Sequence, residues 1–316
     1  MASASLPAAA QEQTAALALP DRLRDLSIEE LTQIEVTSAS KRPEPLSQVA
    51  NALFVITNDD IRRSGYTSVA EALRLAPNLD VRRINAREYA ITARGFGGYE
   101  TARHLLVLVD GRSVYSTLFS GVFWELRELP LEDIDRIEVI SGPGGTLYGL
   151  NAVNGVINII TKEAGSTQGF AARATAGSSE RTAMLRYGGK LGGNGDFRVY
   201  LNVYDRDNFA KGAGSEVDDG GEGIRGGFRT DFGSGDDRFT VQADLFTNDA
   251  KLAAANGEDG GNVLARWNRR LSDTATFQLQ AYYDAFKRRF SLVSDKLEPA
   301  LFTEVWLRVG GSGISL

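Results

Sequence analysis

Residues 130–162 read PLEDIDRIEVISGPGGTLYGLNAVNGVINIITK, and this stretch decides the predicted fold. Its apolar run at 134–140 predicts one strand. The β-branched pattern at 153–161 predicts another, with a turn at Asn154-Gly155 near its start. A phosphate-binding loop would need a helix directly after the glycines, whereas a strand follows them here. We therefore expect the glycines to let two chain segments pass close together in a tight turn. They are Gly142, Gly144, Gly145 and Gly149.

Short helices and strands alternate upstream of this stretch. A helix is predicted at 58–64, with Gly65 as its stop. Ser68 and Glu71 form the capping box of a second helix, which ends before Pro77. Asp110-Gly111 joins two strands of a hairpin and suits the positive φ values of a type I′ turn. Further strands are predicted at 52–57, 79–83 and 89–93, so this part of the chain is expected to be an α+β domain.

The pattern changes after about residue 165 to long alternating strands, at 197–204, 239–246 and 277–282. Each run has one apolar and one polar face over about ten residues, which is typical of a transmembrane β-barrel wall with lipid outside and a wet lumen inside. An ordinary antiparallel sheet packed on a core is the alternative. The barrel is favoured because the polar face carries Arg, Asn, Asp and Gln, and no predicted helix covers the sheet.

Composition excludes several classes of function. The chain has 316 residues, a net charge of −6, one His and no Cys, which leaves no thiolate nucleophile, Cys metal site or His cage. The acidic balance argues against nucleic acid as a partner. The acidic group Glu216, Asp218, Asp219 and Glu222 does not have EF-hand spacing and is interpreted as a solvated hairpin tip. We find no catalytic constellation, cofactor site or metal site and expect no enzyme.

The first 45 residues divide into two segments. Residues 1–26 are interpreted as a leader, either the remnant of an export signal or a low-complexity tail, since the basic and apolar regions of a complete signal are missing. Residues 27–45 read as an extended linker, because Pro43 and Pro45 forbid a helix there.

From residue 46 to 162 the motifs and their order resemble the plug domain of TonB-dependent outer-membrane receptors. The resemblance rests on the opening stretch, with Gly142-Pro143, Tyr148-Gly149 and NAVNGVINIIT at 151–161, and on DDI at 59–61, AEAL at 70–73, ITARGF at 91–96 and VLVDG at 107–111. It implies an α+β plug domain at 46–165, followed at 166–316 by antiparallel transmembrane β-barrel strands. Barrels of this family have 22 strands. The remaining residues suffice for about eight, so the chain is expected to hold an incomplete barrel.

The same resemblance implies energised uptake of a scarce ligand, a ferric siderophore, another metal chelate or a cobalamin-like molecule, through the outer membrane of a Gram-negative bacterium. Its partners would be the periplasmic TonB protein, the ligand and outer-membrane lipid. A plug-containing binding module without transport, or a degenerate receptor fragment, is the alternative.

Two sets of site residues follow from the resemblance. The TonB box is placed at Ile34, Glu35, Val36, Thr37 and Ser38, where an extended strand could add to a partner's sheet edge. Three plug loops are expected to face the ligand, with cations and flat apolar surface that suit an anionic or aromatic chelate. Their candidate residues are Arg82, Arg83, Arg87, Tyr99, Tyr115, Phe119 and Trp124. Some of the aromatic side chains could instead pack inside the plug, Trp124 first among them. Ser141 stands where the family usually has Arg, so a weaker ionic contact between plug and barrel wall is expected.

Overall fold

The computed structural model describes residues 35–36, 44–45, 52–93, 105–116, 121–142, 148–149, 151–209, 218–250, 257–273, 275–290, 293–309 and 312–315. The chain divides into two compact units, residues 1–50 and 51–316. In the first unit, β1 (Glu35–Val36) pairs antiparallel with β2 (Glu44–Pro45). The leader predicted at 1–26 lies outside the described residues.

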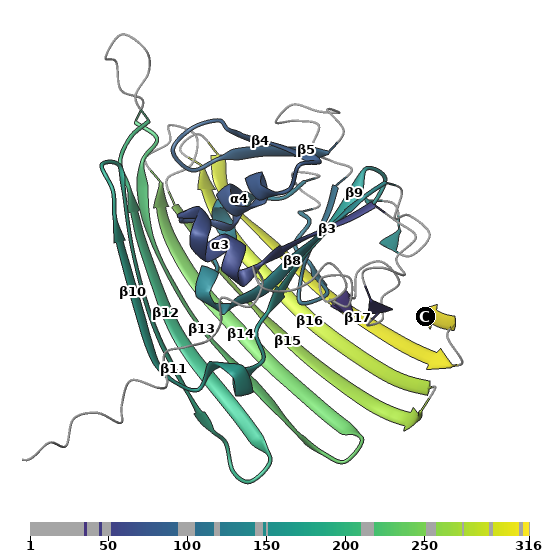
Figure 1. The fold of residues 1–316 in the computed structure, drawn as a ribbon. Coiled ribbons are helices and arrows are strands. Elements are labelled where there is room, and N and C mark those ends of the chain that lie inside the picture. The colour runs from purple at the N-terminus through teal and green to yellow at the C-terminus, as the bar shows by residue number, and fades with distance from the viewer. Residues whose placement is uncertain are drawn as a thin grey trace, which may run out of the picture. The chain divides into compact units, whose positions relative to one another are not determined.

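The second unit begins with an α+β domain at residues 52–161, built on a five-stranded sheet of order β3-β8-β9-β6-β7. Its strands are β3 (Ala52–Thr57), β6 (Leu105–Val109), β7 (Arg112–Ser113), β8 (Ile134–Ser141) and β9 (Gly155–Thr161). Only β6 and β9 pair in parallel among these neighbours. A separate hairpin, β4 (Leu79–Arg83) with β5 (Tyr89–Ala93), lies beside α4 (Figure 1).

The helices of this domain start at side-chain caps. Thr57 caps α3 (Asn58–Ser64) in a capping box with Asp60, and Gly65 ends the helix in the left-handed conformation. Ser68 accepts a hydrogen bond from the backbone N–H of Glu71 at the start of α4 (Val69–Ala72). The 3₁₀ turn η2 (Leu73–Leu75) follows. The second predicted helix is therefore present, but its last turn tightens before Pro77, whose ring cannot continue a helix.

Two glycine-containing turns explain how the domain closes. Asp110 and Gly111 have φ values of 51° and 80° between β6 and β7, as the predicted type I′ turn requires. A Cβ at Gly155 would collide with the carbonyl oxygen of Ile140. Two chain segments thus approach closely at Gly155, where β9 leaves its turn beside β8, whereas Gly149, one of the four glycines for which this was predicted, has no atom within 4 Å of a Cβ.

Besides a smaller cluster around Val156, a larger apolar core lies against this five-stranded sheet. It includes Ile61 and Leu73 from the helical segments and Ile137 and Ile157 from the central strands, all 1% exposed or less. Burying an Ile or Leu side chain stabilises the fold by about 1.5 to 3 kcal/mol. These buried side chains therefore stabilise the domain.

A nine-stranded antiparallel sheet follows, ordered β10 to β18 with each strand beside the next in sequence. Its strands are β10 (Gly169–Ala176), β11 (Glu180–Lys190), β12 (Gly195–Arg206), β13 (Gly221–Ser234), β14 (Asp237–Ala250), β15 (Gly257–Ser272), β16 (Ala275–Phe290), β17 (Val293–Val309) and β18 (Ser312–Ser315). The prediction was about eight strands. The sheet is open, with β10 and β18 at its edges, and it curves around the α+β domain (Figure 1).

The two ends of this sheet differ in their connections. Connections of two to four residues join strands at one end, which we call the short-turn end: 191–194, 235–236, 273–274 and 310–311. At the other end, which we call the long-loop end, 207–220 and 251–256 are longer and 177–179 and 291–292 are short. The longest described helix, α3, has seven residues, so no helix in this part of the chain can traverse a bilayer.

Candidate functional site

The candidate site is the contact between the α+β domain and one face of the nine-stranded sheet. Side chains of the sheet alternate as the sequence predicts. On β12, Arg198 is 4% exposed whereas its neighbour Val199 is 44% exposed. Arg229 and Gln280 are also buried, and the inward side chains bond the α+β domain. The polar face predicted to line a wet lumen is therefore covered by that domain, and the apolar face points outward.

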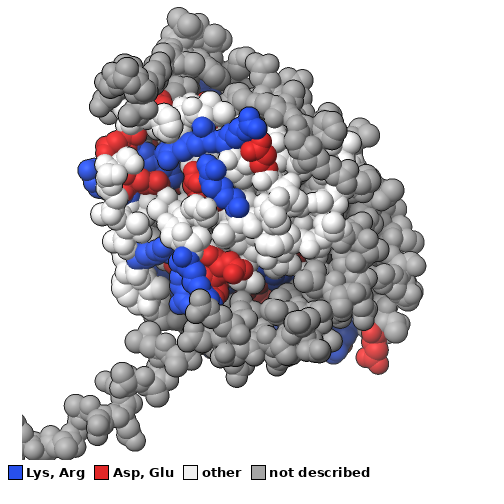
Figure 2. Space-filling view, turned by 45° about the horizontal axis from the view of Figure 1, so that its top comes forward, with Lys and Arg blue, Asp and Glu red and all other residues white. Residues whose placement is uncertain are grey.

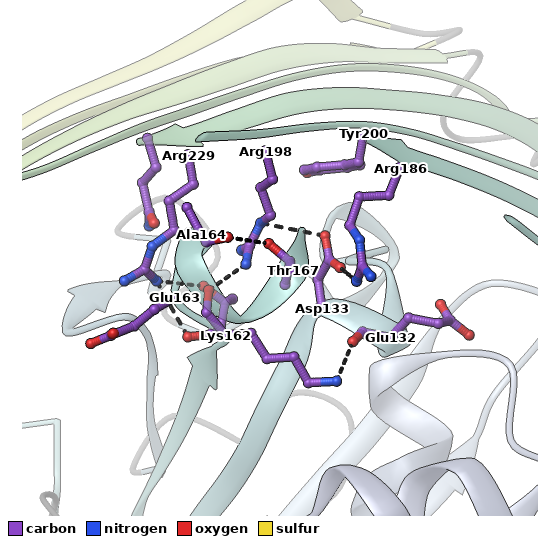
Figure 3. Close-up of polar contacts among 12 residues, drawn as sticks. Glu132, Asp133, Lys162, Glu163, Ala164, Thr167, Arg186, Arg198, Tyr200 and Arg229 are labelled. Atoms are coloured by element: carbon purple, nitrogen blue, oxygen red, sulfur yellow. Dashed lines mark hydrogen bonds and ion pairs between the residues drawn. The ribbon is translucent and has the colours of Figure 1, made fainter. Parts of the chain in front are cut away.

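Asp133 is the centre of one ionic cluster in this contact (Figure 3). It ends the 3₁₀ turn η5 (Leu131–Asp133) and is 2% exposed. Arg186 Nη1 donates to Asp133 Oδ1 at 2.6 Å, and Arg198 Nε lies 3.5 Å from Oδ2. The ammonium of Lys162 donates to the carbonyl of Glu132 at 2.8 Å. Burial, reinforced by the nearby Arg186 charge, lowers the pKa of Lys162. Cations of the sheet thus converge on one buried carboxylate of the domain.

Asp110 anchors a second cluster at the β6–β7 turn. Its carboxylate accepts hydrogen bonds from the backbone N–H and the hydroxyl of Thr161, both at 2.8 Å, and from Gln242 Nε2 at 3.0 Å. Arg229 Nη1 lies 4.0 Å away. Burial opposes ionisation, but the Arg229 charge and the Thr161 N–H outweigh it and hold the pKa of Asp110 below its ordinary value. Asp110 therefore remains an anion and ties the turn to the sheet.

A third cluster lies at the long-loop end and has more carboxylates than guanidiniums. Arg87 Nη2 is 2.7 Å from Glu258, and Arg288 Nη2 lies 2.6 Å from Glu125, 2.8 Å from Glu258 and 3.9 Å from Glu88. Burial raises the pKa of Glu125 to about 7; Arg288 opposes the rise, and repulsion from Glu258 and Glu88 adds to it. In the part of the chain that the structure describes, three carboxylates face two guanidiniums here, and burial favours a protonated Glu125 near neutral pH.

Further ion pairs cross the same contact. They are Arg112–Asp284 at 2.6 Å, Arg206–Glu128 at 2.6 Å and Arg173–Glu132 at 2.5 Å. Ser141, in contrast, accepts a hydrogen bond from Asn78 within the α+β domain. The ionic contacts to the sheet are therefore made from positions other than 141.

The structure separates the candidate ligand residues by exposure. The Arg82 side chain is 73% exposed and pairs with Asp80. Arg83 is half-buried, donates to the carbonyls of Asn85 and Ala86, and lies 5.8 Å from the ring centroid of Tyr89. It therefore shapes the tip of the β4–β5 hairpin.

Arg87 and Trp124 are not presented to solvent. Arg87 is 3% exposed because it is paired with Glu258, and Trp124 is 4% exposed in the apolar core. We therefore no longer propose that Arg87 and Trp124 contact the ligand directly. Tyr115 is half-buried. Tyr99 and Phe119 lie outside the described residues, as do Ile34, Thr37 and Ser38 of the predicted TonB box; its Glu35 and Val36 form β1.

Charges of both signs share the outer surface at the hairpin side of the molecule. Figure 2 shows cationic and anionic side chains interleaved on the face that comes forward. Arg82 and Asp80 are an exposed pair of opposite charge, with Nη2 and Oδ2 2.7 Å apart. The described part of this face therefore mixes both signs of charge, whereas the buried contact places sheet arginines against domain carboxylates.

Comparison with known proteins finds similarity in both parts of the chain. Residues 45–156 match the family described as TonB-dependent Receptor Plug Domain. The vitamin B12 transporter BtuB of Vibrio vulnificus is 33% identical over 145 residues, covering 45% of this chain and 23% of that protein. BtuB of Photobacterium profundum is 30% identical over 199 residues, 61% of this chain and 31% of that protein. The chain thus spans less than a third of the length of these curated relatives.

Solved structures share the fold. The copper transporter OprC aligns with a TM-score of 0.65 at 17% identity, over 81% of this chain and 43% of that one. The siderophore receptor PirA of Acinetobacter baumannii aligns with a TM-score of 0.61 at 15% identity, over 89% of this chain and 46% of that one. In these comparisons the α+β domain and the antiparallel strands align together.

Proposed function

We propose that the protein takes up a scarce ligand across the outer membrane of a Gram-negative bacterium, because residues 45–156 match the plug domain of TonB-dependent receptors and the strands that follow share the fold of solved transporters. One observation carries the proposal: the plug's buried carboxylates are matched by inward-facing arginines of the strands, as at Asp133 with Arg186. A plug held by charge pairs inside a curved wall is an obstruction that an applied force can rearrange.

The ligand class is proposed as a metal chelate or a cobalamin-like molecule. Curated relatives are named vitamin B12 transporters, and the solved neighbours include a copper transporter and a siderophore receptor. Arg82, Arg83 and Tyr115 are the described candidates for contact with the ligand, because the first is exposed and the other two are half-buried. Tyr99 and Phe119 remain proposals from the sequence.

Uptake by the producing cells tests this function. Cells lacking the protein should lose energised accumulation of either labelled cyanocobalamin or a labelled ferric siderophore, and a plasmid copy should restore it. The protein should also fractionate with the outer membrane and shift in gel mobility on heating. A soluble protein that binds chelate without accumulation by the cell would favour the non-transporting module instead.

The TonB box is proposed at residues 34–38, where β1 already has an extended backbone. Val36→Pro removes a backbone donor and fixes φ, so it should disrupt pairing of this strand with an edge of TonB. We expect energised uptake to fall at least tenfold while ligand binding at the cell surface is retained. Val36→Ala keeps the donor and is the matched control. Unchanged uptake in Val36→Pro would overturn the placement.

A further inference from the structure

A groove of about 680 Å³ opens on the outward face of the sheet at its short-turn end. Its apolar walls are Phe232, Phe239, Trp267 and Leu191, and its polar groups include Asp237 and Arg269. Groove volumes of roughly 300 to 1,000 Å³ suit small-molecule ligands. The residues that line the groove take no part in the contact with the α+β domain described above and are not among the candidate ligand residues.

The aromatic walls form a ladder across neighbouring strands. Phe232 and Phe239 are stacked with centroids 5.4 Å apart and planes at 15°, and Phe239 and Trp267 are stacked at 6.0 Å and 5°. Phe277 meets Trp267 edge-on at 5.4 Å. These rings alternate with residues such as Asp231, which bonds the plug segment, so they point away from the plug. Outward aromatic residues near the short turns of a transmembrane barrel mark the level of the lipid headgroups.

An opposite-charge pair stands at the same level. Trp267 Nε1 donates to Asp237 Oδ1 at 2.7 Å, and Arg269 Nη1 lies 3.9 Å from that oxygen. The side chains of Arg269 and Asp237 are 50% and 33% exposed. The indole therefore orients the carboxylate, while the guanidinium keeps donors for another anion. Guanidinium groups bind phosphate through paired hydrogen bonds.

We propose that this groove binds phosphatidylethanolamine, with an acyl chain along the aromatic ladder, the phosphate on Arg269 and the ammonium on Asp237. The assignment rests on the membrane location in the proposed function. A cation and an anion side by side complement a headgroup that carries both charges. Phosphatidylglycerol would bring no ammonium to Asp237, and the quaternary ammonium of phosphatidylcholine has no N–H to donate to the carboxylate.

Lipid titration of the purified, folded protein in non-ionic detergent tests the assignment. Native mass spectrometry would count bound phosphatidylethanolamine, phosphatidylglycerol and phosphatidylcholine. A charge-assisted hydrogen bond predicts about a tenfold preference for phosphatidylethanolamine. Asp237→Asn should remove that preference, and Arg269→Gln should weaken the binding of all three lipids. Gel mobility before and after heating would establish that each variant is folded.

The chain offers a matched control in the same turn. Asp236 and Arg270 form a similar pair at 2.8 Å, with side chains 54% and 62% exposed, but do not line the groove. Asp236→Asn and Arg270→Gln should leave lipid binding unchanged. Equal binding of the three lipids by the wild type, or equal effects of Asp236→Asn and Asp237→Asn, would overturn the proposal. Failure to fractionate with the outer membrane would instead count against the proposed function.

Discussion

The carboxylate of Asp133 illustrates how strongly a single residue joins the plug to the sheet. It is 2% exposed and lies against Arg186 and Arg198. Asp133→Asn would leave both guanidiniums without their anion in a buried place. Removing one partner of a buried ion pair costs about 3 to 5 kcal/mol, and we expect a loss of that order in the free energy of unfolding. Urea unfolding followed by tryptophan fluorescence measures it.

Asp135→Asn is the control for this substitution. The Asp135 side chain is 47% exposed and pairs with Arg136 at 2.6 Å. Exposed pairs contribute about 1 kcal/mol or less, so the loss should be small. Equal losses at positions 133 and 135 would show that burial of the pair is not what matters.

Glu125 makes stability depend on pH near neutrality. Its pKa of about 7 in the folded protein exceeds its ordinary value of 4.5, chiefly because it is buried. The carboxyl group therefore contributes stability that is fully present below about pH 4.5 and is lost as pH rises through 7. The difference corresponds to about 3 kcal/mol. Glu125→Gln should flatten the decline in unfolding free energy between pH 5 and 8.

Asp110 does not contribute to the change in unfolding free energy between pH 5 and 8. Its pKa is lowered, so its contribution is present above the ordinary value of 3.8 and is lost only as pH falls through the lower folded value. Asp135→Asn again serves as a control for loss of an acidic side chain. A decline between pH 5 and 8 that is identical in Glu125→Gln and the wild type would exclude Glu125 as its source.

At the scale of elements, local signals in the sequence predicted what local physics determines. The Asp110-Gly111 turn and the cap at Ser68 occur as expected, because turn and cap preferences depend on a few adjacent residues. Alternation predicted which face of each strand is apolar. Burial of Trp124 in the core agrees with the alternative that the sequence offered for it. Contacts between distant segments were not predictable in this way: Arg87 is buried by its pair with Glu258, far along the chain, which no local pattern reveals.

The arginines on the inner face of the sheet are the part of the candidate site that the sequence did not reveal. Arg186, Arg198 and Arg229 occupy inward positions on three consecutive strands. Their alternation with apolar residues was visible, but it indicated only a polar lumen. Pairing each arginine with a plug carboxylate required the register of the sheet against the domain.

A substitution at Gly155 tests how closely β9 approaches β8 in the plug. A Cβ there would collide with the Ile140 carbonyl, which is fixed in β8. Gly155→Ala must shift one of the strands, and overpacking of this kind costs about 1 to 3 kcal/mol. Gly193→Ala is the control, since no atom lies within 4 Å of a Cβ at that position, and its effect should stay within about 0.5 kcal/mol. Thermal unfolding of the two variants makes the comparison; equal shifts would contradict the predicted clash.

At the scale of the whole molecule, the plug contact combines strong pairs with incomplete hydrogen bonding. Within the described residues, the buried Nε atoms of Arg87, Arg112 and Arg186 have no hydrogen-bond partner. A buried polar group left unpaired costs about 1 to 3 kcal/mol. The contact is therefore less stable than its number of ion pairs suggests, which agrees with the proposed function, in which the plug rearranges under force.

The balance of these terms predicts that plug and strands unfold together. If either part unfolded alone, the buried charges of the other part would lose their ionic partners. Trp124 reports on the plug core once Trp267→Phe and Trp306→Phe remove the other tryptophans, and far-UV circular dichroism reports mainly on the strands. In that background the two urea midpoints should coincide, as two-state unfolding requires. Adding Asp133→Asn and Arg112→Gln should separate them, with Trp124 changing first. Separate midpoints before these two changes would show that the ion pairs do not couple plug and strands.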